Sequence, residues 1–197
     1  MRKPLPNIQD LLLRISKEDM DAYETLYNYF FSPLYTFALS IIHSRQVAEE
    51  IVSDVFIKIW QSKASLPEIK NINVYLYTSI RNRCFDYASK ERRLTIPVFQ
   101  PEDWDNIKIE LKNPLDYCIS SDLIQKINMA VNQLPAQCKM IFKLVKEDGL
   151  SYKQAAEVLQ ISPLTVRNQL MIAVRKMGEA LPSYIHGRPV TDSNKNA

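Results

Sequence analysis

Apolar residues recur at helical spacing along nearly the whole chain, and this pattern limits the possible folds more than any other feature. Between residues 20 and 31, four large apolar or aromatic side chains stand at positions i, i+3, i+4 and i+7, which form one face of a helix. The same spacing covers residues 8–15, 34–42 and 122–134, whereas few stretches suggest strands. The sequence therefore predicts an all-α protein in which Pro33 interrupts the second helix or starts a new one.

The composition argues against several classes of site. The three cysteines, Cys84, Cys118 and Cys138, have no CxxC spacing, which argues against a zinc site or a disulfide framework. The three glycines cannot build a phosphate-binding loop, and the two histidines have no nucleophile or metal-ligand context. We therefore expect no catalytic residues, no metal, no cofactor and no enzymatic activity.

No targeting signal is visible in the sequence. The first ten residues lack the apolar core and the small-residue cleavage site of a signal peptide. No apolar run is long enough to cross a membrane. A cytoplasmic protein is therefore expected.

Residues 74–93 predict a helix with two different faces. One arc is apolar and includes Leu76, Ile80 and Cys84, whereas the other carries Tyr75, Ser79, Asn82, Arg83, Asp86 and Lys90. Aromatic rings, amides and cations are the groups that stack on bases, read base edges and hold phosphates. Nucleic-acid binding is one interpretation of this second face, and an ordinary solvated helix face is the other.

Residues 47–61 predict a helix with a wide core stripe, formed by Ile51, Val52, Val55, Phe56 and Ile59. Ile57 and Trp60 project to the other side, beside Asp54 and Gln61. Exposed apolar side chains next to a carboxylate are typical of a protein-docking surface, unless another helix covers them. The polar stretch 62–73 predicts a connecting loop, whose lysine and asparagines are also suited to hold an extruded base.

Charge is unevenly distributed, although the net charge is only +3. Residues 81–93 contain five Lys or Arg and two Asp or Glu, whereas residues 101–116 contain five Asp or Glu and two Lys. The second stretch also contains prolines, which predicts an acidic linker between two modules. We expect a first domain over 1–93, a linker over 94–120, a second domain over 121–181 and a disordered tail over 182–197.

Residues 149–177 carry the signals of a helix-turn-helix. Ser151 and Gln154 are spaced as a capping box, Gln160 and Ile161 make a tight turn, and Pro163 begins a second helix after its cap. This helix is expected to bury Val166, Leu170, Ala173, Val174 and Met177. Its outward positions are Thr165, Asn168, Gln169, Ile172, Arg175 and Lys176, with Arg167 and Met171 at the edges. These residue types read the major groove and hold phosphates.

Two separate stretches now resemble one protein family. VAEEIVSDVFIKIWQ followed by NINVYLYTSIRNRCFDYASKERR resembles region 2 of the bacterial extracytoplasmic-function (ECF) sigma factors, and residues 134–177 resemble their region 4. The resemblance covers about residues 8–92 and 120–178. It implies a protein that binds core RNA polymerase, directs it to the −35 and −10 elements of promoters, and helps to open the DNA.

The resemblance also implies which residues form the sites. It implies a core-polymerase surface, docking on the clamp helices of the largest subunit, at Asp54, Phe56, Ile57, Trp60 and Gln61. It implies a −10 site, with Asn82 contacting a base, that we place at Lys70, Asn71, Tyr75, Ser79, Asn82, Arg83 and Asp86. It implies a −35 site on the second helix of the helix-turn-helix, with Thr165, Arg167, Asn168 and Met171 at reading positions. We place this site at Thr165, Arg167, Asn168, Gln169, Met171, Ile172 and Arg175. Three positions depart from the family pattern, because Gln160 replaces a common turn glycine and Gln169 and Ile172 replace residues that are often basic.

The partners implied are core RNA polymerase, promoter DNA and an anti-sigma factor, which in this family is often membrane-bound; no small-molecule substrate is expected. Two alternatives remain at this point. One is a helix-turn-helix regulator that acts without polymerase and uses only the C-terminal module. The other is a helical adaptor that does not bind DNA.

Overall fold

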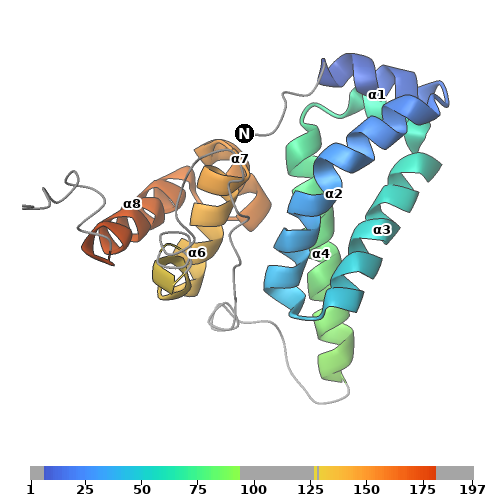
Figure 1. Cartoon of the computed structure of the whole chain (residues 1–197). Coiled ribbons are helices and arrows are strands. Elements are labelled where there is room, and N and C mark those ends of the chain that lie inside the picture. Colours follow the sequence, from blue (N-terminus) through green and yellow to red (C-terminus); the bar gives the residue numbers. More distant parts are fainter. Residues whose placement is uncertain (1–6, 94–126, 128, 181–197) are drawn as a thin grey trace, which may run out of the picture.

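The computed structural model describes residues 7–93, 127 and 129–180, and every regular element in this part of the chain is helical. The all-α prediction is confirmed. The elements form two groups (Figure 1). The first consists of α1 (Ile8–Ser16), α2 (Met20–Ile42), α3 (Arg45–Gln61), the short 3-10 helix η1 (Lys63–Glu68) and α4 (Ile72–Arg93). The second consists of α6 (Ala136–Phe142), the π-helical turn η3 (Lys143–Glu147), α7 (Tyr152–Leu159) and α8 (Pro163–Ala180).

In the first group, α2 packs against α1, α3 and α4, and α1 lies across one end of the bundle with η1 beneath it (Figure 1). The apolar stripes predicted for α3 and α4 form the core, because their members are buried or half-buried. Side chains cap the helices: Asp19 Oδ1 accepts a hydrogen bond from the backbone N–H of Ala22 at 3.0 Å at the start of α2. Burial of one face and capping of the ends together fix the bundle.

The prediction that Pro33 interrupts the second helix is wrong. Helix α2 is continuous from Met20 to Ile42 and Pro33 lies inside it, buried. An internal proline costs about 3 kcal/mol because it lacks an N–H donor and crowds the preceding turn. Phe30, Leu34 and Phe37 are buried on both sides of the proline, and each contributes roughly 1.5–3 kcal/mol. Their burial outweighs the cost, so the helix continues.

The stretch 62–73 is more regular than the connecting loop that the sequence predicts. Its first part forms η1, whose Leu66 is fully buried against α1. Its last part leads into α4, which begins at Ile72, two residues earlier than expected. Asn71 Oδ1 accepts a hydrogen bond from the backbone N–H of Val74 at 3.2 Å, so this residue caps α4. One buried leucine and one cap therefore hold the segment in place.

The second group contains the predicted helix-turn-helix. The capping box is confirmed in both directions, with Ser151 Oγ 3.2 Å from the backbone nitrogen of Gln154 and Gln154 Oε1 2.8 Å from that of Ser151. Helix α7 ends at Leu159, and Gln160 adopts the left-handed conformation with φ of 56°. The prediction that Val174 is buried is wrong, since its side chain is 50% exposed. The buried face of α8 is narrower than expected and follows Val166, Leu170 and Ala173.

The π-helical turn η3 buries a charge. The ammonium of Lys143, which is fully buried, lies 3.1 Å from Glu147 Oε2 and 3.6 Å from Asp148 Oδ2. A buried cation is tolerated where carboxylates compensate its charge. Gly149 follows with φ of +77° and ends this turn.

The two groups touch through α4 and α7 (Figure 1). The sequence did not predict this contact. The expected linker over 94–120 and tail over 182–197 lie outside the described residues. The helix expected over 122–134 is described only in part, at residue 127 and from residue 129 onward, where it is helical to residue 132.

Candidate nucleic-acid and protein interfaces

The polar face of α4 lines two neighbouring hollows. The first, of ≈ 270 Å³, lies between α3 and α4 and is lined by Val55, Lys58, Tyr75, Ser79, Asn82, Arg83 and Asp86. The second, of ≈ 540 Å³, is lined by Ile69, Lys70, Asn71, Val74, Tyr75, Thr78, Ser79 and Glu157. Tyr75 and Ser79 belong to both, and together the hollows include all seven residues assigned to the −10 site. The fold thus gathers these residues on one surface.

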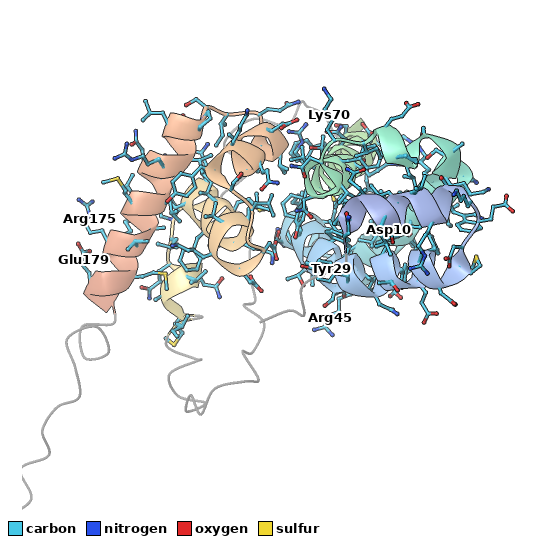
Figure 2. The ribbon with its side chains drawn as sticks, turned by 90° about the horizontal axis from the view of Figure 1, so that it is seen from above. Asp10, Tyr29, Arg45, Lys70, Arg175 and Glu179 are labelled. Atoms are coloured by element: carbon cyan, nitrogen blue, oxygen red, sulfur yellow. The ribbon has the colours of Figure 1, made fainter. Side chains whose placement is uncertain are left out.

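One wall of the second hollow comes from the other group of helices. Glu157 is an exposed residue of α7, and it lines the same hollow as Lys70 and Asn71. Lys70 lies at the edge of the first group beside the second group (Figure 2). The lining of the two hollows also includes the cations Lys58, Lys70 and Arg83 and the carboxylate of Asp86. Glu157 adds a second carboxylate to this surface, and phosphates are repelled by negative charge.

Asn82 is held by its neighbour in the sequence. Arg81 donates to Asn82 Oδ1 from Nε at 3.2 Å and from Nη2 at 2.7 Å. Its third bond crosses to the other group, where Nη1 donates to the backbone carbonyl of Val158 at 2.6 Å. Arg81 is only 4% exposed, and desolvation lowers the pKa of its guanidinium. Sequence reasoning did not assign this residue, although its place at the border between the two arcs of α4 was visible.

The outer face of α3 presents apolar surface. Ile57 is 53% exposed, and Trp60 is half-buried with its ring edge-on to Tyr23, at 5.0 Å between centroids. The ammonium of Lys63 lies 5.0 Å from the Trp60 ring centroid, a cation–π contact that fixes the indole. Asp54 and Gln61 are exposed on the same helix. Asp54 also lies 3.7 Å from Arg83 Nη1, which links this face to the α4 hollows.

Phe56, which the resemblance assigns to the polymerase surface, lies in the core. Its side chain is 1% exposed, and its ring packs against Tyr23 and Tyr27. The Tyr23 hydroxyl donates to the Phe56 carbonyl at 2.9 Å. Phe56 therefore supports the outer face of α3 from behind and offers no surface to a partner.

The second helix of the helix-turn-helix presents a mixed surface. Arg167, Asn168, Met171 and Arg175 are exposed, and Arg175 Nε lies 3.9 Å from Glu179 on the outer side of α8 (Figure 2). Thr165 is half-buried, with its hydroxyl 2.8 Å from that of Ser162.

Gln169 and Ile172 are half-buried and turn toward the neighbouring helix. Gln169 Oε1 accepts from the thiol of Cys138 at 2.8 Å, and Ile172 packs against the cluster of Leu134, Cys138 and Ala173. Part of the surface of both side chains therefore packs inside the domain.

The described cysteines are buried in different surroundings. Burial raises the pKa of the Cys84 thiol to about 12. It also raises the pKa of Cys138, whose thiol donates to Gln169. Within residues 7–93, 127 and 129–180, no group of three His, Cys, Asp or Glu residues is arranged to hold a metal ion. No helix in the same ranges is both long and apolar enough to span a membrane.

Comparison with known proteins places both groups of helices in one family. The model of sigma-70 region 2 matches residues 26–94, and that of sigma-70 region 4 matches residues 124–177. Together they cover more than half of the chain. The RNA polymerase sigma-H factor of Pseudomonas aeruginosa is 21% identical over 179 residues, covering 88% of this chain and 93% of the relative. The ECF RNA polymerase sigma-E factor of Escherichia coli is 24% identical over 172 residues, covering 84% and 89%.

The chain belongs to the ECF sigma factors. Two solved structures share its fold. The sigma factor RpoE of Bartonella quintana, solved with the anti-sigma factor NepR, has a TM-score of 0.57 and 23% identity, and covers 81% of this chain and 96% of its own. CnrH, solved with the cytosolic domain of CnrY, has a TM-score of 0.55 and 16% identity, and covers 89% and 97%.

The two alternatives that the sequence left open are therefore not favoured. A regulator that uses only the C-terminal module does not account for the region 2 match over residues 26–94. A helical adaptor without a DNA role accounts for neither match. The ECF sigma factor, by contrast, uses both groups of helices.

Proposed function

We propose that this ECF sigma factor docks on core RNA polymerase through the outer face of α3, formed by Asp54, Ile57, Trp60 and Gln61. The observation that carries this proposal is the exposed aliphatic side chain of Ile57 beside an aromatic ring that Tyr23 and Lys63 hold in place. Preorganised apolar side chains bind partners well because little conformational freedom is lost. Phe56 has the role of supporting this surface.

The same proposal assigns the −10 element to the two hollows along α4. Tyr75 is exposed at the boundary between the hollows, where its ring is accessible for stacking on an unpaired base. Lys70 and Arg83 supply positive charge for phosphates, and Asn82 supplies an amide for a base edge. Asn71 contributes as the cap that fixes the start of α4, and Ser79 and Asp86 line the hollows. Capture of unstacked bases stabilises the opened strand without any hydrolysis.

The −35 element is assigned to α8, with Arg167, Asn168, Met171 and Arg175 as the exposed contacts and Thr165 at the start of the helix. Asparagine reads adenine in the major groove, and arginine reads guanine or holds a phosphate. Gln169 and Ile172 remain predicted contacts, but each offers less surface to the DNA because both are half-buried.

The whole protein then works as two modules, over 1–93 and 121–181, joined by the acidic linker 94–120. Each module alone binds DNA weakly and with strong salt dependence, and fixing both on the polymerase raises the effective concentration of the second contact. Polymerase performs the chemistry, so this chain needs no catalytic residue, and it acts in the cytoplasm with polymerase. An anti-sigma factor is a proposed partner. One similar solved structure, RpoE, was determined with the anti-sigma factor NepR, and the other, CnrH, with the cytosolic domain of CnrY.

The test is run-off transcription with purified core polymerase on genomic fragments from the source organism. New start sites that require both proteins would support the proposal, and their upstream sequences would supply the −35 and −10 elements. Binding to DNA without binding to core polymerase would refute it.

A further inference from the structure

Arg81 carries a buried charge that no carboxylate in the described part of the chain compensates. Its three hydrogen bonds go to the amide oxygen of Asn82 and the carbonyl of Val158, both of which are neutral, and its guanidinium lies 5.7 Å from the Phe85 ring centroid. Among the described residues no carboxylate forms an ion pair with it. Lys143 is also deeply buried, but its ammonium has two carboxylate oxygens within 3.6 Å. A buried charge without a counter-charge is costly, so this one calls for an explanation.

The position of Arg81 suggests which anion is missing. It borders the −10 surface, because the residue that it holds, Asn82, lines the hollow between α3 and α4. On its other side lies α7, whose Glu157 and Val158 cover this border. Removal of α7 takes away one neutral acceptor and exposes the guanidinium at the edge of a surface assigned to single-stranded DNA. A phosphate oxygen is the acceptor that arginine prefers.

Promoter geometry requires α7 to leave. Elements named −35 and −10 lie about 25 base pairs apart, which is roughly 85 Å at 3.4 Å per base pair. Two compact domains of about 90 and 55 residues in contact measure only about 60 Å from end to end. The chain between them, residues 94–126, is long enough to extend over roughly 100 Å. Simultaneous binding of both elements therefore separates α4 from α7.

We propose that Arg81 is a further residue of the −10 site. In the free protein α7 covers the Arg81 guanidinium, and when α7 leaves, a phosphate of the single strand binds the guanidinium instead. This inference rests on the proposed function. It also assigns a second role to Arg81 as a positioning residue. Arginine has no acceptor, so both of its bonds to Asn82 fix the amide oxygen inward and leave the NH₂ group for the base.

The test measures how binding of a fluorescein-labelled 20-nucleotide oligothymidylate to the full-length protein depends on salt. One phosphate contact to a single strand contributes about 0.7 to the slope of log K against log salt concentration. We expect Arg81→Gln to lower the slope by about 0.7, and Arg81→Lys to keep the wild-type slope because it keeps the charge. Arg45→Gln removes one exposed charge on the side of the bundle opposite Lys70 (Figure 2), and it should leave the slope unchanged.

The slope separates this proposal from a purely structural role. If Arg81 only holds α7, its bond to a neutral carbonyl is lost in Arg81→Gln, and DNA binding tightens with an unchanged slope; that outcome overturns the proposal. An unchanged slope with unchanged affinity overturns it as well, and so does an equal drop in Arg45→Gln. X-ray scattering adds a second readout: the radius of gyration of the wild-type protein should increase when the oligonucleotide binds, and a constant radius contradicts the departure of α7.

The proposed function is decided by a different measurement. Binding of the wild-type protein to core polymerase tests the sigma-factor assignment, whereas the salt slopes are measured without polymerase. Failure of one therefore does not imply failure of the other.

Discussion

Replacement of Ile57 by aspartate tests the polymerase surface most sharply. Ile57 is 53% exposed in the free protein, so docking can bury about half of its side chain. Full burial of an isoleucine contributes roughly 1.5–3 kcal/mol, and half of it about 1 kcal/mol. The carboxylate of Ile57→Asp adds a desolvation cost of at least roughly 1–3 kcal/mol when it enters the interface. The sum, about 2–4 kcal/mol, predicts core binding weakened by about 30- to 1,000-fold.

The assay is titration of fluorescently labelled sigma factor with core polymerase, together with urea unfolding of each variant. The free energy of unfolding of Ile57→Asp should stay within about 0.5–1 kcal/mol of the wild-type value, because a half-exposed helix position contributes little to the core. The matched control is Val174→Asp. Val174 is also β-branched and 50% exposed on a helix, but it lies on α8.

Core binding by Val174→Asp should change by no more than about threefold. Wild-type affinity in Ile57→Asp would refute the α3 surface. Equal losses of core affinity in the two variants would mean that any new surface charge weakens binding, and this result would also refute the α3 surface.

Three further predictions concern α4 and the helix-turn-helix. Asn82→Asp supplies Arg81 with a carboxylate at the position now held by the amide, so the free energy of unfolding should rise by about 0.5–1 kcal/mol at pH 7. Pairing with Arg81 lowers the pKa of this carboxyl in the folded state, so the gain should decline as the pH falls below about 4 and be lost once the folded carboxyl is protonated. Lower stability in urea at pH 7 would contradict this. Asn168→Ala should weaken binding to the cognate −35 duplex by about 1–3 kcal/mol, and equal binding across a promoter library would exclude a reading role. Gln160→Gly relieves a left-handed residue and should raise the free energy of unfolding by about 0.5–1 kcal/mol, which a lower urea midpoint would disprove.

Local patterns predicted most of the fold. The arcs of α3 and α4 and the capping box of α7 follow from helical spacing and cap chemistry, and the structure agrees at each of them. Pro33 misled the prediction because local propensity favours a break, whereas burial on both sides of the proline favours continuity. Val174 was expected to be buried because its position continues the apolar stripe of α8. It is exposed because the neighbouring helices cover only a narrow part of that stripe.

The site was predicted less completely. The residues assigned to the −10 site gather in two hollows because a single helix face carries most of them. The position of Arg81 at the border between the arcs of α4 is visible in the sequence, but its contact is not, because its partner Val158 lies 77 positions away and contributes a backbone carbonyl. The burial of Phe56 had been predicted from its stripe, but the family resemblance alone assigned it to the outer surface.

The buried thiols have a consequence for the conditions under which this protein works. With its pKa near 12, Cys84 is almost entirely protonated at neutral pH, and oxidants such as peroxide react with thiolates. Burial also raises the pKa of Cys138, and its thiol donates a hydrogen bond to the amide oxygen of Gln169. Both side chains should therefore survive an oxidative burst unmodified while the fold holds. Oxidation at these two positions therefore requires the fold to open first, because the folded protein keeps both thiols protonated and buried.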